Sequence, residues 1–112
     1  MTEEDRKCPN RTYYEVSKRY PEVMTSMENL GKTIRNTGPL DEKTSHLIQL
    51  AAAAASQSEG AVHSHTRRAL KAGATRDEIY HCLMLLISTS GFPKAMAAMS
   101  WCRDILEGEC GE

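Results

Sequence analysis

The sequence lacks the features that mark several large classes of protein. No apolar run approaches the ~20 residues that a membrane-spanning helix requires. The first ten residues, MTEEDRKCPN, are polar and acidic, unlike a signal peptide. The formal net charge is −1, and no block of basic residues offers a surface for nucleic acid. We therefore expect a cytoplasmic protein whose partners include neither a membrane nor a nucleic acid.

Paired cysteines are also missing. The four cysteines stand at positions 8, 82, 102 and 110, with no Cys-x-x-Cys and no spacing typical of a zinc site. Without export the thiols should stay reduced. Cys82 and Cys102 fall in helical apolar patterns and are expected in the core, whereas Cys8 and Cys110 lie near the chain ends. We expect no disulfide, no metal and no cofactor.

Strand-like alternation is absent, and helix-favouring residues dominate. A chain of 112 residues fits one domain. We predict an all-α, single-domain bundle of five to six helices with short loops. The helical domain is expected over 11–108, between a flexible N-terminus at 1–10 and a flexible tail at 109–112.

Local signals predict where the helices begin and end. Residues 12–19 and 21–35 are expected to form two helices, and the second has a proline at its first position. Asp41 is a good N-cap for a third helix, which contains the alanine run at 51–55 and should be central and buried. Pro93 should open the last helix.

Two further helices carry capping signals. Ser56 with Glu59, and Thr75 with Glu78, have the spacing of capping boxes. Gly73 is expected just after the end of the first of these helices. The second should bury one face, formed by Ile79, Leu83, Leu86 and Ser90.

The helix after Ser56 carries two histidines on different faces. Its apolar stripe is expected to be Val62, His65, Ala69 and Ala72. Its polar stripe is expected to be Glu59, His63 and Arg67. Residues two apart point roughly 200° from one another on a helix. We therefore predict that His65 points toward other helices, and that His63 lies on the surface within reach of Glu59.

Three stretches together resemble a known family. LDEKTSHLIQLAAAAA, HTRRALKAGATRDEIYHCLMLL and GFPKAMAAM look like the carboxymuconolactone decarboxylase and alkylhydroperoxidase D-like superfamily, over roughly residues 20–106. The resemblance implies an all-α fold and obligate homo-oligomers, commonly trimers or hexamers.

The resemblance also implies a position for each residue of a proton relay. In the peroxidase-like branch a Cys-x-x-Cys precedes a helical histidine, and a glutamate completes the relay. The histidine falls on His65, the two cysteines on Ser58 and Ala61, and the glutamate on His46. Serine and alanine cannot form a redox disulfide. We therefore expect no dithiol peroxidase activity at this site.

The retained histidine suggests the decarboxylase branch instead. We predict a lyase-like enzyme acting on a small carboxylated compound, with His65 and His46 as its catalytic residues. His65 would be the acid or base, and His46 or Ser58 would orient the substrate. Ser58, Glu59 and His63 are the candidate substrate-binding residues, because a helix N-terminus favours an anion.

Three alternatives remain open. The chain could be a non-catalytic ligand-binding or scaffold member of the family. A metal could bind His46 and His65, with help from His63, Glu59 or a neighbouring subunit, although two certain ligands are too few. A residual thiol peroxidase could use Cys82, but its mid-helix position argues for an inert thiol.

Overall fold

The computed structural model describes residues 11–108, and every regular element in that range is a helix. The helices are α2 (Arg11–Arg19), α3 (Pro21–Arg35), α4 (Glu42–Ala55), α5 (Glu59–Lys71), α6 (Arg76–Met84) and α7 (Phe92–Leu106). The predicted all-α class and the number of helices are confirmed. The expected flexible ends, with Cys8 and Cys110, lie outside the described residues.

Most of the predicted helix ends are formed by the expected residues. The Asp41 carboxylate accepts a hydrogen bond from the backbone N–H of Thr44 at 2.7 Å and so caps α4. Thr75 and Glu78 form a reciprocal capping box at the start of α6. Gly73 follows α5 with φ +100°, a conformation that side chains with a Cβ rarely adopt.

The predicted capping box of Ser56 and Glu59 is wrong. Ser56 ends α4, and its backbone N–H donates to the carbonyl of Ala52. Gln57 then takes a positive φ of 56°, and α5 begins after Ser58, whose side chain makes no capping hydrogen bond. The alanine run carries α4 to Ala55, so no room is left for Ser56 to start another helix.

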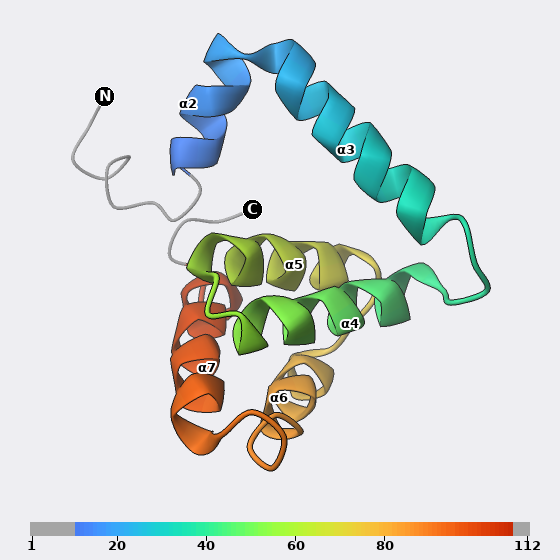
Figure 1. The fold of residues 1–112 in the computed structure, drawn as a ribbon. Coiled ribbons are helices and arrows are strands. Elements are labelled where there is room, and N and C mark those ends of the chain that lie inside the picture. Colours follow the sequence, from blue (N-terminus) through green and yellow to red (C-terminus); the bar gives the residue numbers. More distant parts are fainter. Residues whose placement is uncertain (1–10, 109–112) are drawn as a thin grey trace.

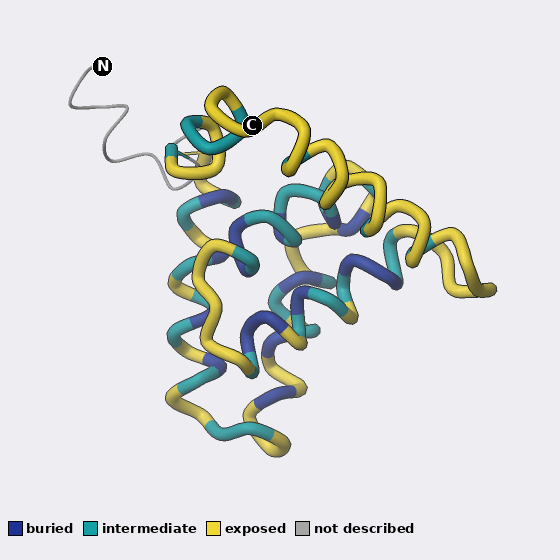
Figure 2. The backbone as a smooth tube through the Cα atoms, turned by 45° about the horizontal axis from the view of Figure 1, so that its top comes forward, coloured by how far each residue is buried: buried dark blue, intermediate teal, exposed yellow. Residues whose placement is uncertain are grey.

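Helices α4 to α7 enclose the core (Figures 1 and 2). Leu50 is fully buried at the middle of α4, and burying such a side chain contributes about 1.5–3 kcal/mol. Ala53 and Ala54 of the alanine run are buried beside it, whereas Ala52 is exposed. Helix α4 contacts α5, α6 and α7, which confirms its central place.

The helix that contains Ile79 is shorter than its apolar pattern predicted. It ends at Met84, and turns follow up to Ser90, whose backbone N–H donates to the carbonyl of Leu86. Leu86 is still buried, because the turns fold it back onto the core. The glycine before α7, Gly91, has φ +111° and redirects the chain.

Helices α2 and α3 pack against each other and stand away from the other four (Figure 1). The side of α3 that carries its apolar residues is open to solvent. Val23, Met27, Leu30 and Ile34 are 59%, 60%, 55% and 58% exposed. No helix in the described part of the chain is long and apolar enough to cross a membrane.

Candidate functional site

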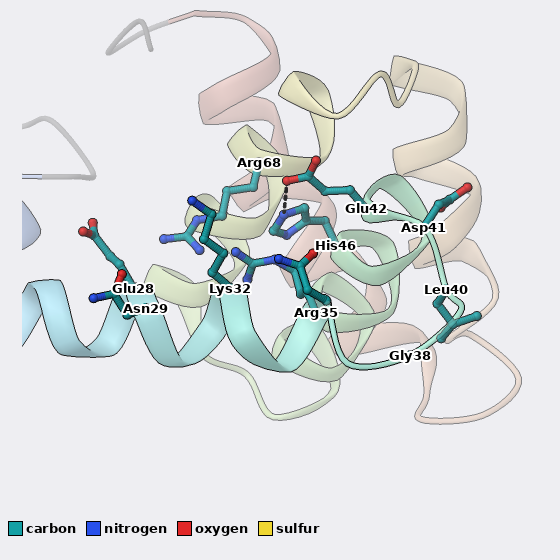
Figure 3. A pocket seen from close by; sticks show the side chains of 11 residues that line it. Glu28, Asn29, Lys32, Arg35, Gly38, Leu40, Asp41, Glu42, His46 and Arg68 are labelled. Atoms are coloured by element: carbon teal, nitrogen blue, oxygen red, sulfur yellow. Dashed lines mark ion pairs between the residues drawn. The ribbon is translucent and has the colours of Figure 1, made fainter.

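An open cleft of about 680 Å³ lies where α3 and the loop after it face α4 and α5 (Figure 3). Its lining is mainly polar and combines both signs of charge. The lining residues are Glu28, Asn29, Lys32, Arg35, Asn36, Gly38, Leu40, Asp41, Glu42, His46 and Arg68. One of them, His46, is a residue that the sequence predicted for the site.

His46 of α4 and His65 of α5 are in contact. Their Nδ1 atoms lie 3.4 Å apart, and the ring centroids are separated by 5.6 Å. His46 is only 2% exposed, and His65 is half-buried. The two predicted catalytic histidines therefore meet, although only His46 lines the cleft. One Nδ1 must donate a hydrogen and the other must accept it, which requires a neutral imidazole on at least one side.

Burial and neighbouring cations keep this pair neutral. Burial is the main cause that lowers the pKa of His46, and the charges of Arg35 and Arg68 lower it further, against a smaller opposing effect of Glu42. Burial, followed by the charges of His46, Arg68 and Arg35, lowers the pKa of His65 to about 4. At pH 7 both rings are therefore neutral and able to accept or pass on a proton.

Three cations surround the cleft face of His46. Lys32 and Arg35 extend from α3, and Arg68 extends from α5 toward the same space (Figure 3). The Glu42 carboxylate, which lines the same cleft, lies 3.9 Å from His46 Nε2. This arrangement offers positive charge to an anionic ligand next to a neutral imidazole.

The sequence did not reveal that Lys32 and Arg35 belong to the site. Both are separated from His65 by about thirty residues, and their helix carries an ordinary mixture of polar and apolar residues. The only available signal is their position on the face of α3 opposite its apolar row, at helical spacing.

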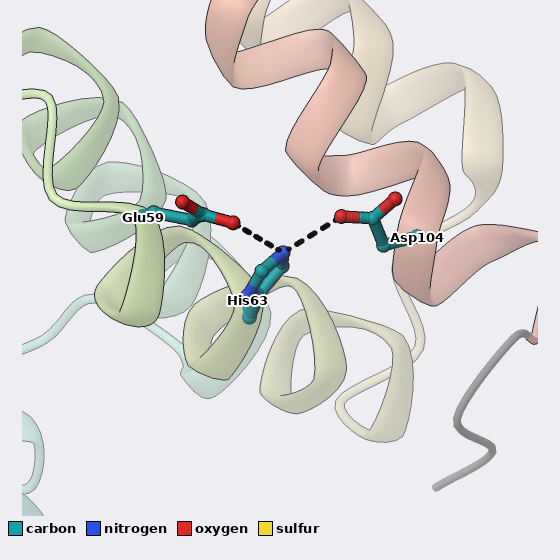
Figure 4. Close-up of side chains that lie close together, drawn as sticks. All are labelled: Glu59, His63 and Asp104. Atoms are coloured by element: carbon teal, nitrogen blue, oxygen red, sulfur yellow. Dashed lines mark hydrogen bonds and ion pairs between the residues drawn. The ribbon is translucent and has the colours of Figure 1, made fainter. Parts of the chain in front are cut away.

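A second cluster lies on the side of α5 that faces α7 (Figure 4). His63 Nε2 is 3.2 Å from Asp104 Oδ2 and 3.9 Å from Glu59 Oε2. His63 is 2% exposed, so its predicted surface position is wrong. The reach of Glu59 to His63 is confirmed.

The error has a physical cause. The prediction from the sequence placed a single buried stripe on α5, but α4 and α7 both pack against this helix. The buried residues of α5 are Val62, His63, Thr66 and Ala69, so the core-facing row passes beside His65 rather than through it.

The family of the chain follows from comparison with known proteins. A model of the carboxymuconolactone decarboxylase family matches residues 21–104. The chain belongs to this family. The match spans α3 to α7 and so includes both histidine clusters.

Relatives and solved structures agree with this assignment. The chain is 29% identical over 102 residues to the uncharacterized protein MJ1511 of Methanocaldococcus jannaschii, which covers 91% of this chain and 95% of that protein. It is 32% identical over 85 residues to MJ0742 of the same organism, covering 75% and 82%. The crystal structure of apo-lpg0406, a carboxymuconolactone decarboxylase family protein from Legionella pneumophila, superposes with a TM-score of 0.69 and 31% identity over 86% of each chain.

In this carboxymuconolactone decarboxylase family member, the predicted site residues fall into separate places. His46 and His65 meet on the α4 side of α5. Glu59 and His63 meet Asp104 on the α7 side. Ser58 is exposed at the start of α5, and none of Ser58, Glu59 and His63 lines the cleft.

The two cysteines of the described chain lack the surroundings of a reactive thiol. The Cys82 Sγ donates to the carbonyl of Leu47 at 3.2 Å, and burial raises its pKa. Cys102 is fully buried beside Thr66 Oγ1 at 3.1 Å, and burial is the main cause that raises its pKa to about 11. Neither thiol sits at a helix N-terminus, where a thiolate is stabilised.

Proposed function

We propose that this family member is a lyase-like enzyme that decarboxylates a small carboxylated compound, of the lactone type, in the cleft. One observation carries the proposal: two contacting neutral imidazoles lie beside a cleft that also holds three cations. The substrate carboxylate pairs with Arg68 and Arg35, and the reacting carbon lies next to His46. No thiol takes part, in keeping with Ser58 and Ala61 at the positions that the resemblance assigns to redox cysteines.

The chemistry requires one proton. Loss of CO₂ breaks the bond between the carboxylate carbon and the adjacent carbon and leaves the electron pair on that carbon, where the lactone carbonyl delocalises it. An imidazole N–H then delivers the proton that takes the place of CO₂. His46 lines the cleft and is the proton donor, and His65 behind it passes a proton back to His46 through the contact of the two Nδ1 atoms. Solvent water replaces the proton that His65 gives up, so that overall the carboxylate and one water yield the protonated product, CO₂ and hydroxide.

The test is turnover of a panel of small carboxylated lactones, followed by mass spectrometry for the loss of CO₂. His46→Gln should abolish turnover. His65→Gln should lower kcat about 10²- to 10⁴-fold, the usual contribution of a positioned acid or base, and should also change the pH profile of kcat. His81→Gln is the control, because His81 is exposed on α6 and away from the cleft. Equal kcat values in all three variants would refute the proposal.

A non-catalytic ligand-binding role is the alternative. It is favoured by the fact that His65, the histidine that the resemblance places at the family position, does not itself line the cleft. Calorimetric titration with the same lactones separates the two functions. Binding without product supports the alternative, and reproducible product formation eliminates it.

We also propose that the protein self-associates. The exposed residues Val23, Met27, Leu30 and Ile34 recur at helical spacing on α3, and the cleft-lining residues of α3 lie on its other face. An amphipathic helix that points its polar face inward and its apolar face outward needs a partner for the apolar face. A second copy that covers this row would also hold α3, and with it Lys32 and Arg35, against the cleft.

A further inference from the structure

The cluster of Glu59, His63 and Asp104 is not used by the proposed decarboxylation and shares no residue with the cleft. One donor atom from each side chain lies within 4.8 Å of the other two. Figure 4 shows the two carboxylates approaching the same ring nitrogen of His63, one from its own helix and one from α7. The side chains come from two helices that pack together, so the fold itself sets their separation.

The one hydrogen that His63 Nε2 can carry cannot form hydrogen bonds to both carboxylates at once. Nε2 of His63 carries at most one hydrogen, and that hydrogen points best at one acceptor. Asp104 Oδ2 at 3.2 Å takes the closer position, which leaves Glu59 Oε2 at 3.9 Å, beyond a hydrogen bond. Two carboxylates beside one nearly buried imidazole form a site with excess negative charge. A divalent cation between the three donor atoms would satisfy all of them.

The distances are close to those of a transition-metal site. Zinc lies about 2.0–2.2 Å from histidine nitrogen and carboxylate oxygen in tetrahedral sites, so neighbouring donor atoms are separated by roughly 3.3–3.6 Å. The distance from His63 to Asp104 already has nearly this value. The Glu59 oxygen is farther away, 3.9 Å from His63 Nε2 and within 4.8 Å of the Asp104 oxygen, so it must approach by up to about an ångström. Its side chain is 56% exposed at the first residue of α5, which leaves it room to do so.

The spacing, burial and charge of the three side chains also suit a divalent ion. Glu59 and His63 are four residues apart on one helix, a spacing that turns two ligands toward the same point. The imidazole is held in place by burial, with its side chain only 3% exposed. The donor set of one nitrogen and two carboxylate oxygens supplies two negative charges against the two positive charges of the ion.

We propose that Glu59, His63 and Asp104 bind a divalent transition-metal ion of the zinc class. The exposed Glu59 leaves the remaining coordination position open to water or to a small ligand. The ion joins the first turn of α5 to α7, so it stabilises the folded chain by mass action. This site is separate from His46 and His65, which the sequence analysis considered as metal ligands. The proposal does not depend on the proposed decarboxylation.

The test is calorimetric titration of zinc chloride into the full chain, reduced, free of any affinity tag and stripped of metal with a chelator. We expect one zinc ion per chain at this site. Asp104→Asn and Glu59→Gln keep the size of each side chain and remove one charged ligand. Each should weaken zinc binding by at least about 100-fold, because loss of outer-shell partners alone costs 10- to 100-fold. Asp77→Asn, an exposed carboxylate on α6, is the matched control and should bind zinc like the wild type.

A second measurement excludes a trivial folding defect. Zinc should raise the thermal midpoint of the wild type and of Asp77→Asn, and should leave that of Asp104→Asn unchanged. Circular dichroism without metal establishes that each variant is folded. Absence of zinc binding by the wild type would overturn the proposal. Zinc binding that persists at full affinity in both Asp104→Asn and Glu59→Gln would also overturn it, because the metal would then be held elsewhere, for example by cysteines.

Discussion

His46 and His65 are nineteen residues apart in the chain, and their Nδ1 atoms lie 3.4 Å apart across the packed helices α4 and α5. The contact depends on the close packing of these two helices. It joins a ring that lines the cleft to a ring behind it. Two imidazoles in contact cannot both be protonated without strong repulsion, so the pair has a pH dependence of its own.

The first prediction concerns stability at acidic pH. The pKa of His65 is about 4 in the folded chain and near 6.5 when unfolded, so the unfolded chain binds more protons between these values. The free energy of unfolding should therefore contain a contribution from His65 that is fully present above pH 6.5 and is lost as the pH falls toward 4. The shift sets an upper limit of about 3.4 kcal/mol, which the partial exposure of His65 to solvent reduces. Urea unfolding of the wild type and of His65→Gln between pH 4.5 and 7.5 measures it.

The difference between the two proteins is the decisive quantity, because carboxylates also titrate in this range. The wild type should lose more stability than His65→Gln as the pH falls. His81→Gln should follow the wild type, since His81 is exposed. Parallel curves for the wild type and His65→Gln would contradict the prediction.

The second prediction concerns Arg68. Its charge lowers the pKa of His65 and of His46, and its side chain lines the cleft. Arg68→Gln should raise the pKa of both histidines, which ring-proton chemical shifts followed against pH will measure. The same change should weaken binding of a small carboxylated lactone about 10- to 100-fold, since a hydrogen bond to a charged group contributes about 1.5–3 kcal/mol.

The matched control is Arg19→Gln on α2, which removes an exposed cation outside the cleft. It should leave both the histidine titrations and the lactone affinity unchanged. If Arg68→Gln and Arg19→Gln behaved alike, the cleft cations would have no role in holding the anion.

The sequence predicted the parts of this fold that depend on local signals. Asp41 and the pair Thr75 and Glu78 cap their helices as expected, because each cap involves residues within four positions of one another. The capping box predicted for Ser56 and Glu59 was wrong, because the preceding alanines favour helix and carry α4 up to Ser56. The prediction that His63 lies on the surface was wrong for a different reason. A stripe on one helix cannot reveal that two other helices cover it.

Some residues of the candidate site were likewise predicted from the sequence, and others were not. The approach of His46 to His65 was expected only because a family resemblance placed both residues in one relay. The cations from α3 and the carboxylate of Asp104 were not expected at all. These residues reach their positions through tertiary packing, and nothing in their sequence neighbourhood distinguishes them from ordinary surface charges.

The third prediction concerns self-association through α3. Leu30→Lys places a charge in the middle of the exposed apolar row and should reduce the mass measured by light scattering toward that of one 12.5 kDa chain. Burial of each large apolar side chain contributes about 1.5–3 kcal/mol, so one lysine in a contact repeated around an oligomer should have a large effect. Thr25→Lys adds the same charge at an exposed position on the other side of α3 and should leave the mass unchanged. A wild type that is monomeric at micromolar concentration would refute the proposed assembly.

The last prediction concerns Cys102. Its thiol is fully buried, contacts Thr66 Oγ1 and has a pKa of about 11, so almost no thiolate exists at pH 8. Alkylation with iodoacetamide at pH 8, followed by peptide mass spectrometry, should leave Cys102 unlabelled in the native protein and label it fully in urea. The native protein should also fail to consume hydrogen peroxide through this residue, so Cys102→Ser should not change the rate of peroxide loss. Rapid native labelling of Cys102, at a rate comparable to that in urea, would show that α7 opens far more readily than its packing indicates and would reopen the question of thiol chemistry in this chain.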